Sequence, residues 1–374
     1  MLRFTWPVLT GVSLMTIALA QSPTVPPSVG GVPAPGKSAT PTASPSPTPT
    51  AEQLLNSLGP ADLQAVIALL QSNFTNPDAI TDTELNRATV QGLMIRLPHG
   101  VMLLPTRESA PPEAPSAFYS EILDGHIGYM RLGSLNNANL QAMDKSLGNF
   151  AIKKVDALIV DLRASQATND FAMAAEFAKR FCPKGKTLFT LRKTAARQDR
   201  VFKSDRDPAF RGLMMVLADG DTAGAAEALA GVLRFYDKAL VMGQPTAGRA
   251  VEYTDLPLPS GKLLRVAVAE MILPEGRASF PDGIKPDLPV EMSLTEKRQI
   301  FRLSSEKGMG PFIYQPGRPH MNEAALLAGT NPEVEAAEAA QQRRGRSPEK
   351  SPAHDPVLQR ALDLVTSLEI YQKR

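Results

Sequence analysis

The sequence predicts an α/β protein with parallel strands, because short apolar runs alternate along the chain with patterns of helical period. Apolar residues dominate Val155–Arg163 and Leu213–Leu217, as they do in strands that are covered on both faces. Helical patterns lie around Phe171–Phe181 and Ala223–Tyr236. Parallel strands need a crossover segment between them, and helices of this length supply one. We therefore expect helices packed on a largely parallel sheet.

Further strands are expected on either side of this alternation. The run His126–Leu132, HIGYMRL, has the composition of a strand, and Ala239–Met242 is a short apolar run. The segment Thr254–Pro274, TDLPLPSGKLLRVAVAEMILP, predicts a β-hairpin with Ser260 and Gly261 at its turn. These strands complete the predicted core.

Weaker patterns flank this core, which we place at residues 119–295. In residues 51–104 apolar side chains recur at helical spacing and Thr81–Glu84, TDTE, fits a capping box, which predicts a small helical N-terminal region. In residues 296–374 the pattern thins, although Val357–Lys373 carries an apolar stripe. We expect this tail to be helical, peripheral and partly disordered.

The N-terminus has the features of an export signal. Met1–Ala20 contains one early basic residue, Arg3, then a short apolar run and a small-x-small ending, which predicts a signal peptide cleaved to leave Gln21 first. The alternative is an uncleaved membrane anchor. Residues 21–50 are nearly all Pro, Ser, Thr, Gly, Ala and Val, so we expect a disordered linker. No later run is long enough to span a membrane, and we expect a periplasmic or secreted protein.

Composition excludes several classes of function. The chain has 40 basic and 38 acidic residues, a net charge of +2 and 6% aromatic residues, so it offers no basic face for nucleic acid. Its single cysteine, Cys182, follows an apolar helical pattern and is expected to be a buried small hydrophobe. We expect no metal site and no cofactor, because the histidines are scattered without the spacing of metal ligands. They are His99, His126, His320 and His354.

The segment Val216–Leu233, VLADGDTAGAAEALAGVL, runs from an apolar strand through a turn of small residues into a helix. Such a turn exposes one side chain beside the positive end of a helix, where a nucleophile can work and an oxyanion can be held. Its central residues include Thr222, Gly224 and Ala225, with neither serine nor cysteine. The shape of the turn suits a nucleophile that the sequence does not supply.

The order of these motifs resembles the C-terminal processing peptidases, also called tail-specific proteases, over about residues 69–290. The resemblance implies a core of the crotonase and Clp-peptidase type, and it implies a PDZ domain before the core that this chain has no room for between Leu104 and His126. Six motifs occur in the family's order. They are NFTNPDAITDTELNRATVQGLMIRLPHG, GHIGYMRLGSL, ALIVDLR, VMGQPTAGR, LPSGKLLRVAVAEMILPEG and DGIKPDLPV.

The resemblance also places the family's catalytic residues on this chain. The family's turn reads serine-alanine-serine-alanine-serine-glutamate, with the middle serine as nucleophile. Aligned on Glu227, the nucleophile position is Gly224, and the outer serines correspond to Thr222 and Ala226. The family's general-base lysine ends the motif that reads GQPTAGR here, so the base position is Arg249.

A third departure lies in the family's oxyanion loop, aspartate-leucine-arginine-x-asparagine-proline-glycine-glycine. Here it reads DLRASQAT, with Ala167 and Thr168 in place of the glycines. Glycine has no side chain with which to form an acyl-enzyme, and arginine stays protonated where lysine can be neutral and accept a proton. Losing one oxyanion donor alone lowers the rate about 100- to 1,000-fold. The chain therefore resembles a peptidase without its catalytic groups.

Three functional hypotheses follow. The first is an exported, inactive relative that binds peptides or proteins. The second is an active serine-type endopeptidase with a substitute nucleophile, for which Thr222 and Ser165 are the candidates, although a turn or N-cap role for Thr222 is the simpler interpretation. The third is a structural envelope protein. In the family's pattern Glu227, Asp161 and Arg163 have structural roles.

A binding role would use the groups that surround the nucleophile position. We expect Arg249, Ala225 and Thr246 to contact a ligand, and unstructured or C-terminal segments of envelope proteins to be the partners. The guanidinium of Arg249 suits a carboxylate because it is always charged and forked. The alternative is an Arg249 that forms a salt bridge within its own chain, to Glu252 or Asp255.

Overall fold

The computed structural model describes residues 50–76, 80–105, 116–193, 197–236, 239–313 and 353–372, with four isolated positions between the last two ranges. The predicted signal peptide, and the predicted linker up to residue 49, lie outside these ranges and stay predictions. The chain forms two compact units, Met1–Pro77 and Asp78–Arg374. Among the described residues, no helix combines the length and the apolar character needed to cross a membrane.

The first unit contains the helices α1 (Ala51–Ser57) and α2 (Pro60–Asn73). Thr50 caps α1 by accepting a hydrogen bond from the backbone N–H of Gln53 at 3.3 Å. The apolar residues of α2 are exposed. The helical pattern predicted here is confirmed.

The second unit begins with α3 (Asp82–Arg96). The N-cap half of the predicted capping box is confirmed, since the hydroxyl of Thr81 accepts from the N–H of Glu84, whereas the side chain of Glu84 pairs with Arg87. Residues 51–104, expected as one helical region, thus divide between the two units. The end of this range also differs from the prediction, because Val101–Leu104 form the strand β1. Four apolar residues can form a strand where a neighbouring strand is available for pairing. Here β1 pairs antiparallel with β10 (Leu263–Ile272).

A six-stranded sheet forms the centre of the second unit, in the order β11-β8-β7-β4-β3-β2. The pairs between β3, β4, β7, β8 and β11 are parallel, and β2 pairs antiparallel with β3. The predicted parallel sheet is confirmed. Its strands are β2 (Tyr119–Leu123), β3 (Ile127–Arg131), β4 (Ala157–Asp161), β7 (Leu213–Ala218), β8 (Leu240–Gly243) and β11 (Leu288–Pro289).

A second, five-stranded sheet is antiparallel and has the order β1-β10-β5-β6, with β9 (Val251–Pro257) also paired to β10. The predicted hairpin is therefore confirmed as β9 and β10. Two strands of this sheet, β5 (Thr187–Lys193) and β6 (Gln198–Lys203), were not predicted. Half of the residues of β6 are charged and most of the strand is exposed, so its apolar signal is weak.

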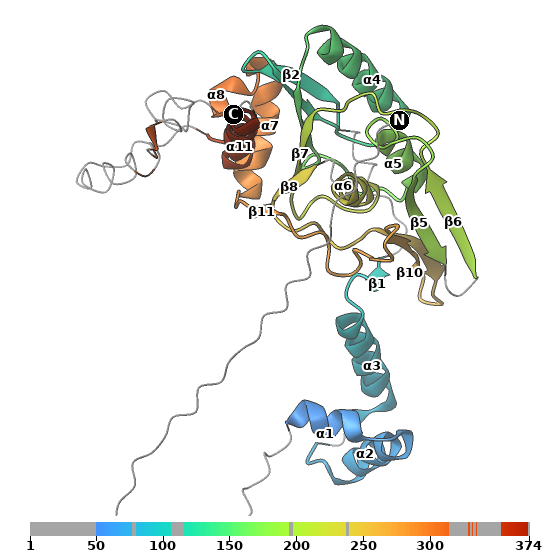
Figure 1. Ribbon diagram of the computed structural model, residues 1–374. Helices are drawn as coiled ribbons and strands as arrows, with labels where there is room; N and C mark the ends of the chain where they lie inside the picture. The colour runs from blue at the N-terminus through green and yellow to red at the C-terminus, as the bar shows by residue number, and fades with distance from the viewer. Residues whose placement is uncertain are drawn as a thin grey trace, which may run out of the picture. The chain divides into compact units, whose positions relative to one another are not determined.

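Helices cover both faces of the central sheet, as Figure 1 shows. Successive residues of a strand point to opposite faces of the sheet. Leu158 and Val160 pack in the core on one face, and Ile159 packs in the core on the other. The first face carries α4 (Asn137–Ile152), α5 (Phe171–Ala178) and α6 (Ala225–Phe235). The second face carries α7 (Leu294–Lys307), α8 (Gly310–Ile313) and α11 (Pro356–Gln372).

The C-terminal helix corrects the expectation of a peripheral tail. In α11 the side chains of Val357, Leu358, Ala361, Leu362 and Val365 are almost wholly buried against the second face of the sheet. A parallel sheet needs both faces covered, and the apolar stripe of the tail supplies the cover on this side. Most of the tail before residue 353 lies outside the described residues, so its expected disorder stays a prediction. The core also contains Cys182, which is fully buried as expected.

Candidate functional site

The turn between β7 and α6 holds the predicted nucleophile position. Gly224 is the N-cap of α6 and has φ +59° and ψ −123°, a conformation that L side chains rarely adopt. The helix begins at Ala225. The turn thus has the sharp strand-to-helix geometry that the sequence predicted.

The loop that follows β4 lies against this turn. The strands β4 and β7 are parallel neighbours, so the segments that leave their carboxyl ends meet at one edge of the sheet. Thr168 forms an isolated β-bridge with Gly224, and its carbonyl oxygen accepts a hydrogen bond from the N–H of Ala225 at 2.9 Å. A Cβ placed on Gly224 would lie only 2.4 Å from this oxygen. The carbonyl of Thr168 therefore fills the space of a side chain at residue 224 and occupies the adjacent N–H donor.

The segment that follows β8 completes the arrangement. The N–H of Gln244 donates to the carbonyl of Ala218 at 3.0 Å, and the N–H of Ala247 donates to the carbonyl of Thr222 at 3.0 Å. These bonds hold the predicted base motif beside the turn. The structure thus brings together the three segments whose motifs the sequence singled out.

A buried carboxyl group connects the turn to the segment of Arg249. Glu227 is 0% exposed, and its Oε2 accepts a hydrogen bond from the backbone N–H of Arg249 at 2.9 Å. Burial raises the pKa of Glu227 from 4.5 to about 7, although the bond from Arg249, the hydroxyls of Thr246 and Ser279 and the charge of Arg249 all act to lower it. Neither hydroxyl makes a well-formed hydrogen bond to the other oxygen, Oε1.

The guanidinium of Arg249 does not form the salt bridges that we considered as an alternative. In the described part of the chain, Glu252 pairs with Arg200, and Asp255 pairs with Arg265 at 2.7 Å. The Nε of Arg249 is buried and has no hydrogen-bond partner there. The side chain thus retains an unsatisfied donor beside a buried carboxyl group.

The two candidate substitute nucleophiles differ in their surroundings. The hydroxyl of Thr222 is fully buried, accepts from the N–H of Asp219 at 3.1 Å and donates to the carbonyl of Leu162 at 3.4 Å, which is the work of a turn residue. The hydroxyl of Ser165 is buried and has no hydrogen-bond partner among the described residues. The geometry therefore gives Thr222 a structural task.

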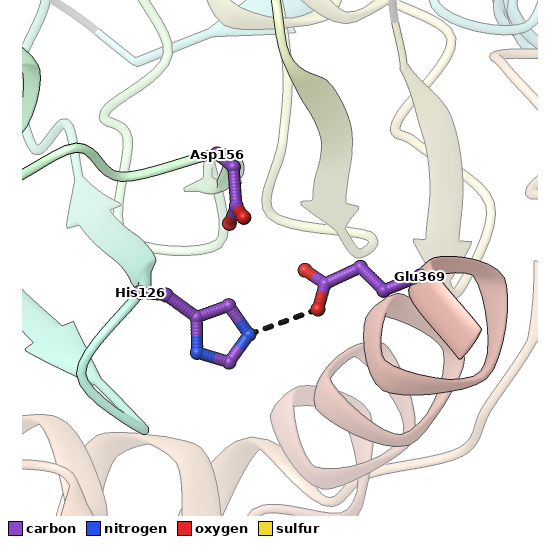
Figure 2. Close-up of side chains that lie close together, drawn as sticks. All are labelled: His126, Asp156 and Glu369. Carbon is purple, nitrogen blue, oxygen red and sulfur yellow. Dashed lines mark hydrogen bonds and ion pairs between the residues drawn. The ribbon is translucent and has the colours of Figure 1, made fainter. Parts of the chain in front are cut away.

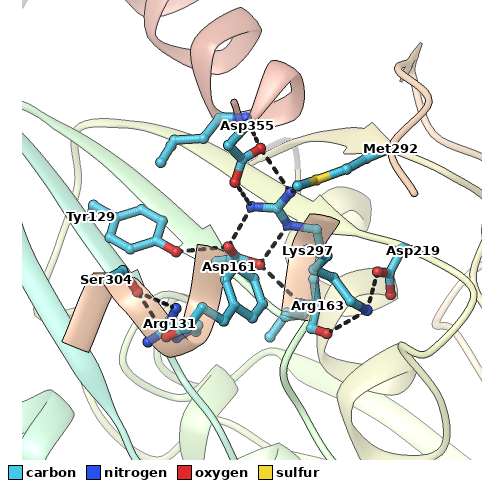
Figure 3. A network of polar contacts seen from close by, with 12 residues as sticks. Tyr129, Arg131, Asp161, Arg163, Asp219, Met292, Lys297, Ser304 and Asp355 are labelled. Carbon is cyan, nitrogen blue, oxygen red and sulfur yellow. Dashed lines mark hydrogen bonds and ion pairs between the residues drawn. The ribbon is translucent and has the colours of Figure 1, made fainter. Parts of the chain in front are cut away.

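Beneath the oxyanion loop lies a buried ion-pair network, drawn in Figure 3. The guanidinium of Arg163 contacts Asp161 at 2.7 Å and Asp355 at 2.8 Å, and all three side chains are at most 1% exposed. Burial opposes ionisation, but the charge and hydrogen bonds of Arg163 hold the pKa of Asp161 below 3.8. Tyr129 donates a further hydrogen bond to Asp161 at 2.8 Å. The structural roles expected for Asp161 and Arg163 agree with these contacts.

A lysine of α7 anchors the other segment of the site. Lys297 is 4% exposed, donates to the carbonyl of Arg163 at 3.0 Å and pairs with Asp219 at 2.5 Å and Asp221 at 2.8 Å. Asp219 and Asp221 begin the turn that leads to Gly224. Two helices of the C-terminal layer therefore hold both loops of the site.

The family model for peptidase family S41 matches residues 126–290. This match places residues 126–290, but not the rest of the chain, in peptidase family S41. The S41 domain covers β3 to β11, including the turn at Gly224 and the base motif. The resemblance to the tail-specific proteases and the predicted fold class are both confirmed.

The chain is also similar to curated processing proteases and to a solved structure. The chain is 28% identical over 177 residues to carboxyl-terminal-processing peptidase 2, chloroplastic, of Arabidopsis thaliana, covering 47% of this chain and 34% of that protein. It is 27% identical over 231 residues to the carboxy-terminal-processing protease of Bartonella bacilliformis, covering 55% and 52%. A crystal structure of a putative peptidase from Parabacteroides merdae matches with a TM-score of 0.48 and 16% identity, covering 79% and 92%. The chain thus spans a third to about half of the curated relatives' length.

Sequence reasoning did not find the partners that hold the S41 site in place. Asp355 and Lys297 lie after the matched region, in a tail without family motifs. A signal existed for Asp355 alone, because this charged residue directly precedes the apolar stripe of Val357–Lys373, where burial demands a partner. The contact made by the carbonyl of Thr168 could not be predicted from residue type, since every residue has a backbone carbonyl group.

We predict that Glu227→Gln removes a pH dependence of folding stability. Because the pKa of Glu227 in the folded protein lies above its ordinary 4.5, the protonated form's contribution to stability is complete below about pH 4.5 and is lost as the pH rises through about 7. From about pH 4.5 to about pH 8, the free energy of unfolding of the wild type should fall by about 3 kcal/mol relative to that of the variant. Urea unfolding at a series of pH values measures this difference.

The matched control is Glu306→Gln, which changes an exposed carboxylate on α7. Its stability should follow the wild-type curve. Parallel curves for Glu227→Gln and wild type would contradict the assignment of the buried carboxyl group.

Proposed function

We propose that the S41 domain of this chain is catalytically inactive and serves as a module that binds peptide C-termini. The hydrogen bond between the Thr168 carbonyl and the Ala225 N–H, 2.9 Å long, is the observation that carries the proposal. An oxyanion needs donors at this point, and a carbonyl oxygen both repels negative charge and removes the donor that the turn offers. Without a nucleophile at Gly224, no acyl-enzyme forms there.

The base position supports the same proposal. Arg249 carries a permanent charge, so it does not accept a proton from a nucleophile. Its neighbour Glu227 accepts a hydrogen bond from the backbone of Arg249 and is enclosed by protein, which leaves the carboxyl group without a path to substrate. The site retains a positive charge and hydrogen-bond donors, but it has neither a nucleophile nor a general base.

A role in binding carboxylates follows from the unsatisfied guanidinium. The buried Nε of Arg249 has no hydrogen-bond partner in the described part of the chain, and a buried donor without a partner is unfavourable by about 1–3 kcal/mol. A carboxylate would satisfy it with a charge-assisted bond. Residues 105–118, between β1 and β2, are too few for a separate peptide-binding domain. Recognition of a peptide's end would therefore use the S41 domain itself.

We further propose that the chain acts after export, in the periplasm or outside the cell. The basic start, apolar run and small-x-small ending of Met1–Ala20 support export. N-terminal sequencing of the mature protein should begin at Gln21. A mature protein that retained Met1 would indicate an anchor instead.

We predict that neither wild type nor Gly224→Ser hydrolyses unfolded or C-terminal peptides. A serine at residue 224 would place its Cβ 2.4 Å from the Thr168 carbonyl at a positive φ, so the variant should also lose stability, by about 1 kcal/mol or more. Peptide cleavage and labelling by a serine-reactive fluorophosphonate measure activity, and urea unfolding measures stability.

The double variant with Arg249→Lys provides the comparison, because it restores both the hydroxyl and an ionisable base. Only a trace of activity is expected from it. Stoichiometric labelling of wild type would overturn the inactive assignment and favour a substitute nucleophile, and a fully active Gly224→Ser protein would contradict our account of Arg249.

We predict that Arg249→Ala weakens the binding of peptides with a free C-terminal carboxylate at least tenfold. The reason is the loss of a charge-assisted hydrogen bond, which contributes about 1.5–3 kcal/mol. Calorimetric titration with a library of C-terminal peptides, and with their amidated forms, measures this effect. Arg302→Ala, an exposed arginine on α7, should bind as wild type. Absent binding, or binding indifferent to Arg249→Ala and to amidation, would remove the proposal.

A further inference from the structure

A cluster of three potential metal ligands lies at the amino edge of the central sheet. His126 directly precedes β3 and Asp156 directly precedes β4, and the first residues of these parallel strands, Ile127 and Ala157, are paired. The N–H of Asp156 donates to the carbonyl of His126 at 3.2 Å. Glu369 enters from α11, 243 residues away from His126 in sequence. The turn at Gly224 follows the carboxyl end of β7. The cluster, at the amino ends of the parallel strands, therefore lies at the opposite end of the sheet from the S41 site.

The imidazole of His126 is oriented as a ligand would be. Its Nδ1 lies 2.8 Å from the carbonyl oxygen of Asp124, and because a carbonyl only accepts, Nδ1 carries a hydrogen. In most metal-binding histidines the nitrogen that does not bind the metal makes a hydrogen bond of this kind, which holds the ring in place. The other nitrogen, Nε2, is hydrogen-bonded to Oε2 of Glu369 at 3.1 Å. A metal ion could take the place of the proton in this hydrogen bond, because Nε2 without its proton offers a lone pair and the carboxylate offers an oxygen.

The carboxylates add further negative charge at the same point. Figure 2 shows Asp156 and Glu369 directing their oxygens toward one another beside the ring of His126. One oxygen or nitrogen from each of the three residues lies within 4.8 Å of the others. The second oxygen of Glu369, Oε1, is buried and has no hydrogen-bond partner among the described residues. The exposed Asp156 leaves the cluster open to ions from solvent.

We propose that His126, Asp156 and Glu369 bind a Zn²⁺ ion. Two carboxylates and a neutral imidazole balance the charge of a divalent cation, and one nitrogen with two oxygens is a donor set that Zn²⁺ accepts. Three protein ligands with a water molecule complete a tetrahedron. Metal–ligand distances of about 2.0–2.2 Å require the three atoms to approach to about 3.4 Å, a shift within reach of side-chain rotation. The ion would fasten the last turns of α11 to the edge of the sheet.

Zinc binding to the purified mature chain without a polyhistidine tag tests the proposal. Equilibrium dialysis and competition with a chromogenic chelator should show one Zn²⁺ per chain, and saturating Zn²⁺ should raise Tm by several degrees. Co²⁺, as a substitute, should give the visible absorption of a four-coordinate site. The variants His126→Gln, Asp156→Asn and Glu369→Gln should each weaken Zn²⁺ binding by more than about tenfold.

Two control variants keep the test specific. His99→Gln and Glu306→Gln remove a histidine and an exposed carboxylate elsewhere, and they should bind Zn²⁺ as wild type does. Melting curves without metal identify any ligand variant that fails to fold, and the remaining two variants then carry the result. The proposal is overturned if wild type binds no stoichiometric Zn²⁺, if binding survives Asp156→Asn and Glu369→Gln, or if Mg²⁺ raises Tm equally. These outcomes do not depend on whether the S41 domain is active.

Discussion

The buried guanidinium of Arg163 is the constraint on which the arrangement of this domain depends. A fully enclosed positive charge is tolerable only while both of its carboxylate partners, Asp161 and Asp355, stay in place. Asp161 ends β4, and Asp355 directly precedes α11, so one ion-pair cluster joins the central sheet to the C-terminal helix. Removing a single partner of such a pair typically destabilises a protein by about 3–5 kcal/mol. The helix therefore cannot leave the sheet without exposing or stranding this charge.

The same layer determines the geometry of the S41 site. Lys297 reaches from α7 to the turn after β7 and to the backbone of Arg163, so both loops at the carboxyl edge of the sheet share one support. Held in this way, the loop after β4 directs the carbonyl of Thr168 at the N–H of Ala225. A rigid support of this kind could position catalytic groups equally well. Here it positions the hydrogen bond from Ala225 to Thr168 on which the proposed inactivity rests.

Beside the turn at Gly224 lies one group of atoms that departs from the rule that buried polar groups are paired. Glu227 Oε1, Arg249 Nε and Ser279 Oγ are all buried without a hydrogen-bond partner among the described residues. Proteins retain such unfavourable groups mainly at functional sites. Under the proposed binding role, the ligand would supply the missing partners beside the turn at Gly224.

By itself, the sequence determined the parallel alternation of β4 and β7 with their helices, the β9–β10 hairpin, and the absence of a serine at residue 224 and a lysine at residue 249. These features are local. The spacing of apolar residues follows from which side of an element is buried, and the chemistry of a side chain follows from its residue type. Only the tertiary structure decided that Asp355 reaches Arg163 across 192 residues, that α11 covers the sheet, and that Thr168 presents its carbonyl to Ala225. The direction of a peptide group and the partner of a distant charge depend on how the elements pack, which no local pattern encodes.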